Sequence, residues 1–407
     1  MGWRRRSSGE SKMDLTESLE GIVPDPIRYW VRVCKDAGAV NMFTIGVPDP
    51  IPTEVLEVYA KAVYDQEMKG ATGYPPFVGE EEFKKSIIDM EGNFGAELAD
   101  DDVNRMYVTV GASQGLQFIF SIFKPGSEVL VNTPAWGTIH NMIAHSGNVG
   151  VPAPLFEEGR FVVENAEKAL TEKTQAVYVN FPANPSGELV AESEIKKMCG
   201  WAVAENLQIV SDEPYKYTIF DRKKTPYKSP VSFGSDINAN VSLLSSFSKI
   251  VKPDVRMGFI RVSPSIMAAH EMVGFYFRNL SAGASRGLQA GLRAMIDGDP
   301  KLGFLKSVVE GYRVKSELTQ KRLGEWGCEF PYKPAGTYML FPTTPDGSDA
   351  EEWVKKTATE KKCGFIPGTS FGGSYPGFEH LKKHFRMGVG GGLTLEKLET
   401  VLDELVG

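Results

Sequence analysis

The stretch Ser245-Ser246-Phe247-Ser248-Lys249 follows a short apolar run at 241–244 and precedes a second one at 257–262. Both runs predict buried strands, which places Lys249 in a tight crossover between them. A bare ammonium group is costly to bury, so a lysine at this position needs a chemical reason. One such reason is a Schiff base, because a desolvated lysine is nucleophilic toward an aldehyde cofactor. The alternative is a lysine in a polar surface turn.

Groups on either side of Lys249 can hold an anion. Ser246 precedes the lysine, and Arg256 follows it by seven residues. Upstream, a predicted strand at 105–110 runs into Gly111-Ala112-Ser113-Gln114-Gly115 and then an apolar helix. The free N–H groups and the dipole of a helix N-terminus favour a phosphate. Because the pattern is neither a Walker loop nor G-x-G-x-x-G, it does not indicate a nucleotide.

Composition sets the class of protein. The chain has 407 residues, of which 42% are hydrophobic and 24% charged, as expected for a soluble protein with one large and one smaller domain. A net charge of −7 argues against nucleic acid or an anionic membrane as partner. No apolar run approaches the roughly 18 residues that span a bilayer. Four scattered cysteines predict free thiols in the cytoplasm, and the histidine spacing predicts no catalytic metal.

Strands and helices alternate through the middle of the chain, which predicts an α/β fold with a mostly parallel sheet sandwiched by helices. Ligands of such folds bind at the carboxyl ends of the strands. After residue 263, long helices and short strands predict a smaller α+β domain. We expect a disordered tail (1–12), an N-terminal arm that forms part of the small domain (13–50), a large cofactor-binding domain (51–285) and a small C-terminal domain (286–407).

Distinctive side chains follow three of the predicted strands. Trp136 offers a flat face for stacking on a ring, and Asp212 can pair with a protonated ring nitrogen. Asn184 and Tyr215 can hydrogen-bond a ring hydroxyl. With the Lys249 amine and the anion site, every functional group of pyridoxal 5′-phosphate has a partner. Each residue also has a purely structural explanation, such as a helix cap for Asp212. It is improbable that all of these structural explanations apply at once.

The sequence resembles fold-type I pyridoxal-phosphate enzymes, and specifically the class I/II aminotransferase family of aspartate and aromatic aminotransferases. The motifs that match are N-P-S-G at 184–187, D-E-P-Y at 212–215 and S-F-S-K at 246–249. The resemblance extends from about residue 40 to the C-terminus and implies a seven-stranded type of sheet. It further implies that Lys249 carries the cofactor as an internal aldimine, and that Asp212 and Tyr215 contact its ring.

The resemblance also assigns residues outside these motifs. It implies that Arg386 grips the substrate α-carboxylate, for which a guanidinium fork is suited. Gly46 corresponds to a glycine that lies over the substrate, and Trp136 and Asn184 would border the substrate as well. Tyr74 corresponds to a loop tyrosine that reaches the cofactor phosphate of the other subunit, which implies a homodimer with shared sites.

The chain departs from the family pattern in three places. The seven-residue spacing from Lys249 to Arg256 is one shorter than in aspartate enzymes and closer to the aminoadipate/kynurenine-type branch. The segment Gly388-Val389-Gly390-Gly391-Gly392 is unusually rich in glycine. Arg278 and Arg286 both lie near the region where a reader of a distal substrate carboxylate is expected, but the sequence assigns this role to neither, so it does not indicate a dicarboxylate substrate.

We therefore expect an aminotransferase that moves an amino group from an L-amino acid to a 2-oxo acid. A lyase, a cyclising synthase or an oxidase on the same scaffold is the first alternative, because a cofactor site does not define the reaction. A non-catalytic ligand sensor with this fold is the second. It would need a DNA-binding segment, for which the roughly 40 residues before the fold are too few.

Overall fold

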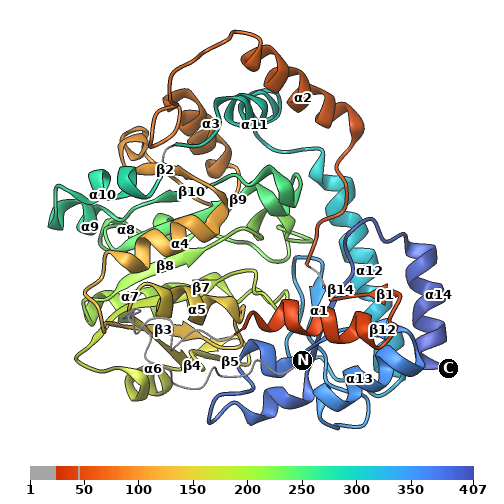
Figure 1. Ribbon diagram of the computed structural model, residues 1–407. Helices are drawn as coiled ribbons and strands as arrows, with labels where there is room; N and C mark the ends of the chain where they lie inside the picture. Colours follow the sequence, from red (N-terminus) through yellow and green to blue (C-terminus); the bar gives the residue numbers. More distant parts are fainter. Residues whose placement is uncertain (1–23, 45, 282) are drawn as a thin grey trace, which may run out of the picture.

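A seven-stranded sheet forms the centre of the computed structural model, which describes residues 24–44, 46–281 and 283–407 (Figure 1). From β9 to β4 the neighbouring strands are parallel, whereas β10 is antiparallel to both β9 and β2. The prediction of a mostly parallel sheet is confirmed. In sheet order the strands are β2 (Met106–Thr109), β10 (Gly258–Arg261), β9 (Val241–Ser246), β8 (Gln208–Asp212), β7 (Thr174–Asn180), β3 (Glu128–Asn132) and β4 (Val149–Ala153).

Helices cover both faces of this sheet, because successive residues of a strand point to opposite faces. In β7, Val177 packs into the core beneath α3, α7 and α11, whereas Tyr178 packs into the core beneath α4 and α5. Both faces are therefore apolar, as expected of a parallel sheet. The helices around the sheet are α2 (Thr53–Glu67), α3 (Glu81–Gly92), α4 (Gly111–Ser121), α5 (Thr138–His145), α6 (Val163–Ala169), α7 (Glu192–Ala204), α8 (Ser235–Asn238), α9 (Pro264–Ala269), α10 (Val273–Leu280) and α11 (Arg286–Gly298).

The connection that carries Lys249 differs in kind from the prediction. The two flanking strands form as expected, but β9 and β10 are antiparallel neighbours. The connection is therefore a hairpin-type loop that begins with a 3-10 turn, Phe247–Lys249, and the predicted crossover is wrong. Apolar runs indicate strands but not their relative direction, which depends on pairing. The hairpin returns Arg256 to the edge of the sheet at which β9 ends.

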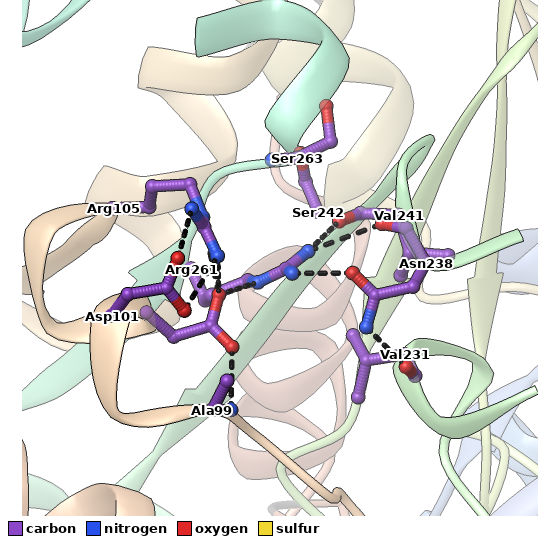
Figure 2. Close-up of polar contacts among 10 residues, drawn as sticks. Ala99, Asp101, Arg105, Val231, Asn238, Val241, Ser242, Arg261 and Ser263 are labelled. Carbon is purple, nitrogen blue, oxygen red and sulfur yellow. Dashed lines mark hydrogen bonds and ion pairs between the residues drawn. The ribbon is translucent and has the colours of Figure 1, made fainter. Parts of the chain in front are cut away.

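A buried arginine holds β10 in place (Figure 2). Arg261 donates to Asp102 at 2.7 Å, to the Val241 carbonyl at 2.9 Å and to the Asn238 side chain at 2.5 Å. Burial acts to raise the pKa of Asp102, but Arg261 together with the hydrogen bonds from Ala99 and Arg105 holds that pKa below its ordinary value. Arg261 thus joins β10 to the turn before β2 and to the start of β9, which secures the three strands on this side of the sheet.

A second hydrophobic core lies beside the first, at the lower right of Figure 1. It is built from α1 (Pro26–Asp36), the C-terminal part of α12 (Leu305–Glu325), α13 (Ala350–Glu360) and α14 (Leu395–Val406). Its strands form an antiparallel sheet, β11-β14-β13, and a parallel pair, β1-β12. These strands are β11 (Met339–Leu340), β14 (Phe385–Gly388), β13 (Ile366–Pro367), β1 (Asn41–Met42) and β12 (Cys363–Gly364), and a separate hairpin joins β5 (Phe156–Glu157) to β6 (Arg160–Phe161).

The described part of the predicted N-terminal arm packs on this second core, since β1 pairs with β12 and α1 contacts α13. After the predicted boundary at 285/286, α11 still packs on α2 and α3, and the chain passes to the second core along α12. The domain limits remain predictions. The predicted tail (1–12) and residues 13–23 of the arm lie outside the described residues. Within the described ranges, we find no helix that combines the length and the apolarity needed to cross a membrane.

Candidate active site

A cavity of about 510 Å³ opens at the carboxyl ends of the parallel strands, between the sheet and the second core. Most of the predicted site residues line it, although they come from distant parts of the chain. The structure brings together Gly46, Ala112, Ser113, Trp136, Asn184, Asp212, Tyr215, Ser246, Lys249, Arg256 and Arg386.

Two of the predicted residues are not among those that line the cavity. The Gln114 side chain accepts from Val110 N at 2.7 Å and donates to Leu280 O at 3.4 Å, so it is engaged elsewhere. Tyr74 is 80% exposed on its loop. A single chain therefore does not bring Tyr74 to its own cavity.

Lys249 lies at the cavity wall, immediately after β9. Its Nζ donates to Gly46 O at 3.5 Å and lies 5.7 Å from the centre of the Tyr215 ring. Burial, with a further contribution from Arg386, lowers the pKa of Lys249 to about 8. A substantial fraction of the amine is therefore neutral near physiological pH, which makes it a nucleophile and a base.

Asp212 ends β8 and is buried. Tyr178 donates to its Oδ2 at 2.8 Å, whereas Oδ1 has no hydrogen-bond partner among the described residues. Burial raises the pKa of Asp212 to about 7, although Tyr178 and Lys249 act in the opposite direction. A buried acceptor without a partner is costly, so this oxygen is suited to a donor supplied by a ligand.

The first turn of α4 and the Lys249 loop form a polar corner of the cavity. Arg256 donates to Ser248 Oγ at 3.2 Å, and Ser246 also lines this corner. The helix packs tightly on β10, because a Cβ at Gly258 would lie 2.6 to 2.9 Å from the backbone of Ser245, Gly111 and Ala112. A guanidinium, a hydroxyl and a helix N-terminus together are suited to a phosphate.

Arg386, on β14, faces the cavity from the second core. It donates to Asn184 Oδ1 at 3.0 Å and to Thr44 O at 2.6 Å, and its guanidinium lies 5.0 Å from the Phe371 ring. Its Nε has no hydrogen-bond partner among the described residues, and burial lowers the pKa of Arg386 to about 10. A buried guanidinium without a carboxylate partner is suited to bind one from a ligand.

Comparison with known proteins agrees with this arrangement. The sequence profile described as aminotransferase class I and II matches residues 43–405. The chain belongs to the aminotransferase class I and II family. Its activity is therefore that of an aminotransferase, and the lyase, synthase and oxidase alternatives are not favoured.

Two relatives illustrate how far the similarity of this aminotransferase extends. It is 28% identical to the aspartate aminotransferase of Pyrococcus abyssi over 97% of each chain, and 27% identical to the aromatic-amino-acid aminotransferase 2 of Thermococcus litoralis over the same shares. Among solved structures, the aromatic aminotransferase of Pyrococcus horikoshii has a TM-score of 0.80 at 25% identity, covering 96% of this chain and 97% of that one.

Sequence reasoning missed several residues of the aminotransferase site. Tyr178, which binds Asp212, lies in the middle of a strand and carries no local signal of its role. Asn180 lines the cavity and donates to Asp212 O at 2.7 Å. Its place at the end of β7, next to Asp212 in the register, could have identified it. One wall comes from α1 and its N-cap residue Asp25, together with Ile27, Arg28 and Val31.

The two arginines considered for a distal carboxylate lie elsewhere in this chain. Arg278 stacks on the Phe275 ring at 4.9 Å. Arg286 donates to Gly73 O at 3.0 Å and to Tyr74 O at 2.8 Å. Neither lines the cavity of its own chain, and Arg286 instead holds the loop that carries Tyr74.

A fully buried charge network lies directly behind the Asp212–Tyr215 turn. Lys216 donates to Glu91 and, at 3.1 Å, to Glu213 Oε2, and all three side chains are completely buried. Glu213 also accepts from Ser211 Oγ and Ser229 Oγ, both at 2.7 Å. Since Glu213 follows Asp212 and Lys216 follows Tyr215, this network holds both ends of the turn.

We expect Lys216→Met to destabilise the aminotransferase by about 3–5 kcal/mol, because it leaves two carboxylates buried without their cation. Burial already raises the pKa of Glu91. A carboxyl group whose pKa is raised by folding favours the folded state at low pH, and this contribution is lost as the pH increases. The loss of unfolding free energy caused by Lys216→Met should therefore be larger at pH 8 than at pH 6. Urea unfolding at the two pH values measures it.

Lys197→Met is the matched control. Lys197 pairs with Glu194 at the same i,i+3 spacing, at 2.6 Å, but is exposed. Its urea midpoint should change little at either pH. Equal effects of the two substitutions would contradict the role given to the buried network.

Proposed function

We propose that this aminotransferase binds pyridoxal 5′-phosphate in the cavity and moves an amino group from an L-amino acid to a 2-oxo acid. The observation that carries the proposal is the unpartnered Asp212 Oδ1, buried in the same cavity as the Lys249 amine. An acceptor of this kind fits the protonated nitrogen of a heterocycle, and a lysine with a lowered pKa fits an aldehyde.

The remaining groups of the cofactor also fit the residues present. The corner formed by α4, Ser246 and Arg256 would hold the phosphate, with Ala112 and Ser113 in the first helical turn. Asn184 and Tyr215 would bind the ring hydroxyl, and Trp136 would lie against the ring. When bound, the cofactor supplies an aldehyde for the amine and a ring that delocalises electrons released at the substrate Cα.

Each step on the protein side follows from these positions. Arg386 binds and orients the substrate carboxylate, and Gly46 and Trp136 border the substrate. Lys249, which has a pKa near physiological pH, would accept a proton from the substrate Cα. Asp212 would hold the protonated ring nitrogen of the cofactor. Arg386 of the second core lines the cavity opposite the strand ends, so this core covers part of the site.

The amine of Lys249 should react with pyridoxal phosphate in a characteristic pH range. Only the neutral amine reacts, so with a pKa of about 8 the rate of uptake by cofactor-free protein should increase about tenfold from pH 7 to pH 9 and then level off. An ordinary lysine would show an increase of about a hundredfold over the same range. Borohydride reduction at timed intervals, followed by mass spectrometry of the Lys249 peptide, measures the rate.

Lys249→Ala should abolish this labelling, whereas Lys252→Ala, at an exposed lysine of the same loop, should leave it unchanged. The absence of label on wild-type protein would reject the cofactor. A hundredfold increase in the rate of uptake from pH 7 to pH 9 would reject the lowered pKa of Lys249.

The reaction itself is tested with a panel of amino donors, in the presence and absence of 2-oxoglutarate or pyruvate. Because relatives are named for aspartate and aromatic amino acids, the panel should include both classes. We expect product only when a 2-oxo acid is present, and a KM at least about tenfold higher for Arg386→Lys, which lacks the bidentate fork. Ammonia release, or product without a 2-oxo acid, would reject amino transfer.

We also propose a homodimer in which Tyr74 reaches the cofactor phosphate in the partner's site. Tyr74 is exposed, and Arg286 holds its loop by two backbone carbonyls. Exposed apolar side chains occur near this loop and on α10, which is unusual for a surface in contact with water. They are Phe77, Met272, Phe275, Tyr276 and Leu280.

Mixing two defective variants tests the shared site. Tyr74→Phe should bind pyridoxal phosphate about tenfold more weakly, and Lys249→Ala should be inactive. In a mixed dimer, one site receives both Lys249 and Tyr74 intact, so mixing should restore cofactor affinity and activity. Mixtures that show only the sum of the separate activities, or a monomer in sedimentation, would contradict this arrangement.

A further inference from the structure

A strap of five residues, Gly46 to Pro50, forms part of the connection from β1 to α2, and its first residue contacts Lys249. Gly46 O accepts from Lys249 Nζ at 3.5 Å and from Tyr338 OH at 3.3 Å. Gly46 and Val47 both line the cavity. The strap is thus a wall of the active site, and its position determines both the substrate space and one contact of the reactive amine.

Near the C-terminal end of the strap, Asp49 is bound by residues at the second core. Asp49 Oδ2 pairs with Lys315 Nζ at 2.5 Å, and Asp49 Oδ1 accepts from Gly392 N at 2.8 Å. The Asp49 backbone N–H donates to Tyr312 OH at 2.6 Å. The Lys315 side chain is only 6% exposed and that of Asp49 16%, so solvent screens this ion pair weakly.

The glycine-rich segment at 388–392 allows this close approach. A Cβ at Gly390 would lie 2.2 Å from Val47 O and 3.1 Å from the Tyr338 ring, so only glycine fits there. Val389 N donates to Tyr338 O at 2.8 Å, and Val389 O accepts from Lys315 Nζ at 3.2 Å. The glycine-rich segment therefore contacts the strap, the Lys315 side chain that pairs with the strap, and Tyr338, which binds Gly46.

Two of these residues, Lys315 and Asp49, have no place in the chemistry described above, and neither lines the cavity. An ion pair buried away from the reacting atoms costs desolvation and adds little net stability. Its location, between α12 and a strap that borders the substrate, indicates another use.

We propose that Lys315 and Asp49 are positioning residues that clamp the strap, with Gly390 as the surface against which it is pressed. The clamp holds Gly46 O against the Lys249 amine and keeps Val47 at the substrate side of the cavity. This inference rests on the proposed function, because it takes the cavity to be the amino-acid site.

Three variants disturb the clamp by different physical routes. Lys315→Met and Asp49→Asn remove the ion pair, whereas Gly390→Ala displaces the strap without changing a charge. Each should raise the KM for the amino donor about tenfold while kcat changes less than about threefold, since the strap borders the substrate and not the cofactor phosphate. The double variant at 49 and 315 should show no further increase, because the two side chains act as one unit.

The controls lie on the same helix as Lys315. Lys306→Met removes an exposed lysine, and Gly311→Ala adds a methyl group that would meet no heavy atom within 4 Å apart from its chain neighbours and the backbone of its own helix. Both should keep wild-type KM. Pyridoxal phosphate affinity should be wild-type in all five single variants, which provides a measurement independent of turnover.

The outcomes separate the two proposals. If wild-type protein neither takes up pyridoxal phosphate nor transfers amino groups, the proposed function fails. If wild type does both, but Gly390→Ala and Asp49→Asn keep its KM and change only thermal stability, the clamp is overturned. Should Lys315→Met fail to fold, Asp49→Asn and Gly390→Ala still decide the question.

Discussion

The parallel pairing of β9, β8, β7 and β3 is the constraint on which the rest of the structure depends. Parallel strands end at the same edge of a sheet. In register, Asp212 at the end of β8 lies beside Asn180 of β7 and Leu244 of β9. This alignment brings the chain after β9, with Lys249, next to the Asp212 carboxylate. The antiparallel β10 begins at this same edge, which adds Arg256 to the cavity.

Burial then gives these side chains their chemistry. The cavity is bordered by the strand ends of the sheet on one side and by α1 and β14 on the other. Desolvation disfavours charge, so it lowers the pKa of Lys249 and raises that of Asp212. The same burial would be costly without compensation. The network of Lys216 with Glu91 and Glu213 holds the polar turn, and two buried atoms without a hydrogen-bond partner among the described residues, Asp212 Oδ1 and Arg386 Nε, belong to side chains that line the cavity.

Much of this site could be predicted because its residues follow strands. Asn184, Asp212 and Lys249 each come soon after an apolar run, and ligands of α/β sheets bind where such runs end. Gln114 shows where this reasoning stops. It belongs to the same helical turn as Ala112 and Ser113, but the helical period directs its side chain to Val110 and Leu280. Tyr178 was missed because a tyrosine inside a strand resembles an ordinary core residue.

The sequence by itself determined the order of strands and helices, the alternation that makes the sheet mostly parallel, and the residue types at the strand ends. These follow from local periodicity and chemistry. Only the tertiary structure decided that β10 is antiparallel, that α1 forms a wall of the site, and that Asp49 meets Lys315. Those contacts join residues far apart in the chain, and their existence depends on packing between the two cores. The glycine-rich segment at 388–392 illustrates the difference. Its composition is evident from the sequence. The reason for the glycines, which is the close passage of the strap, is evident only from the tertiary structure.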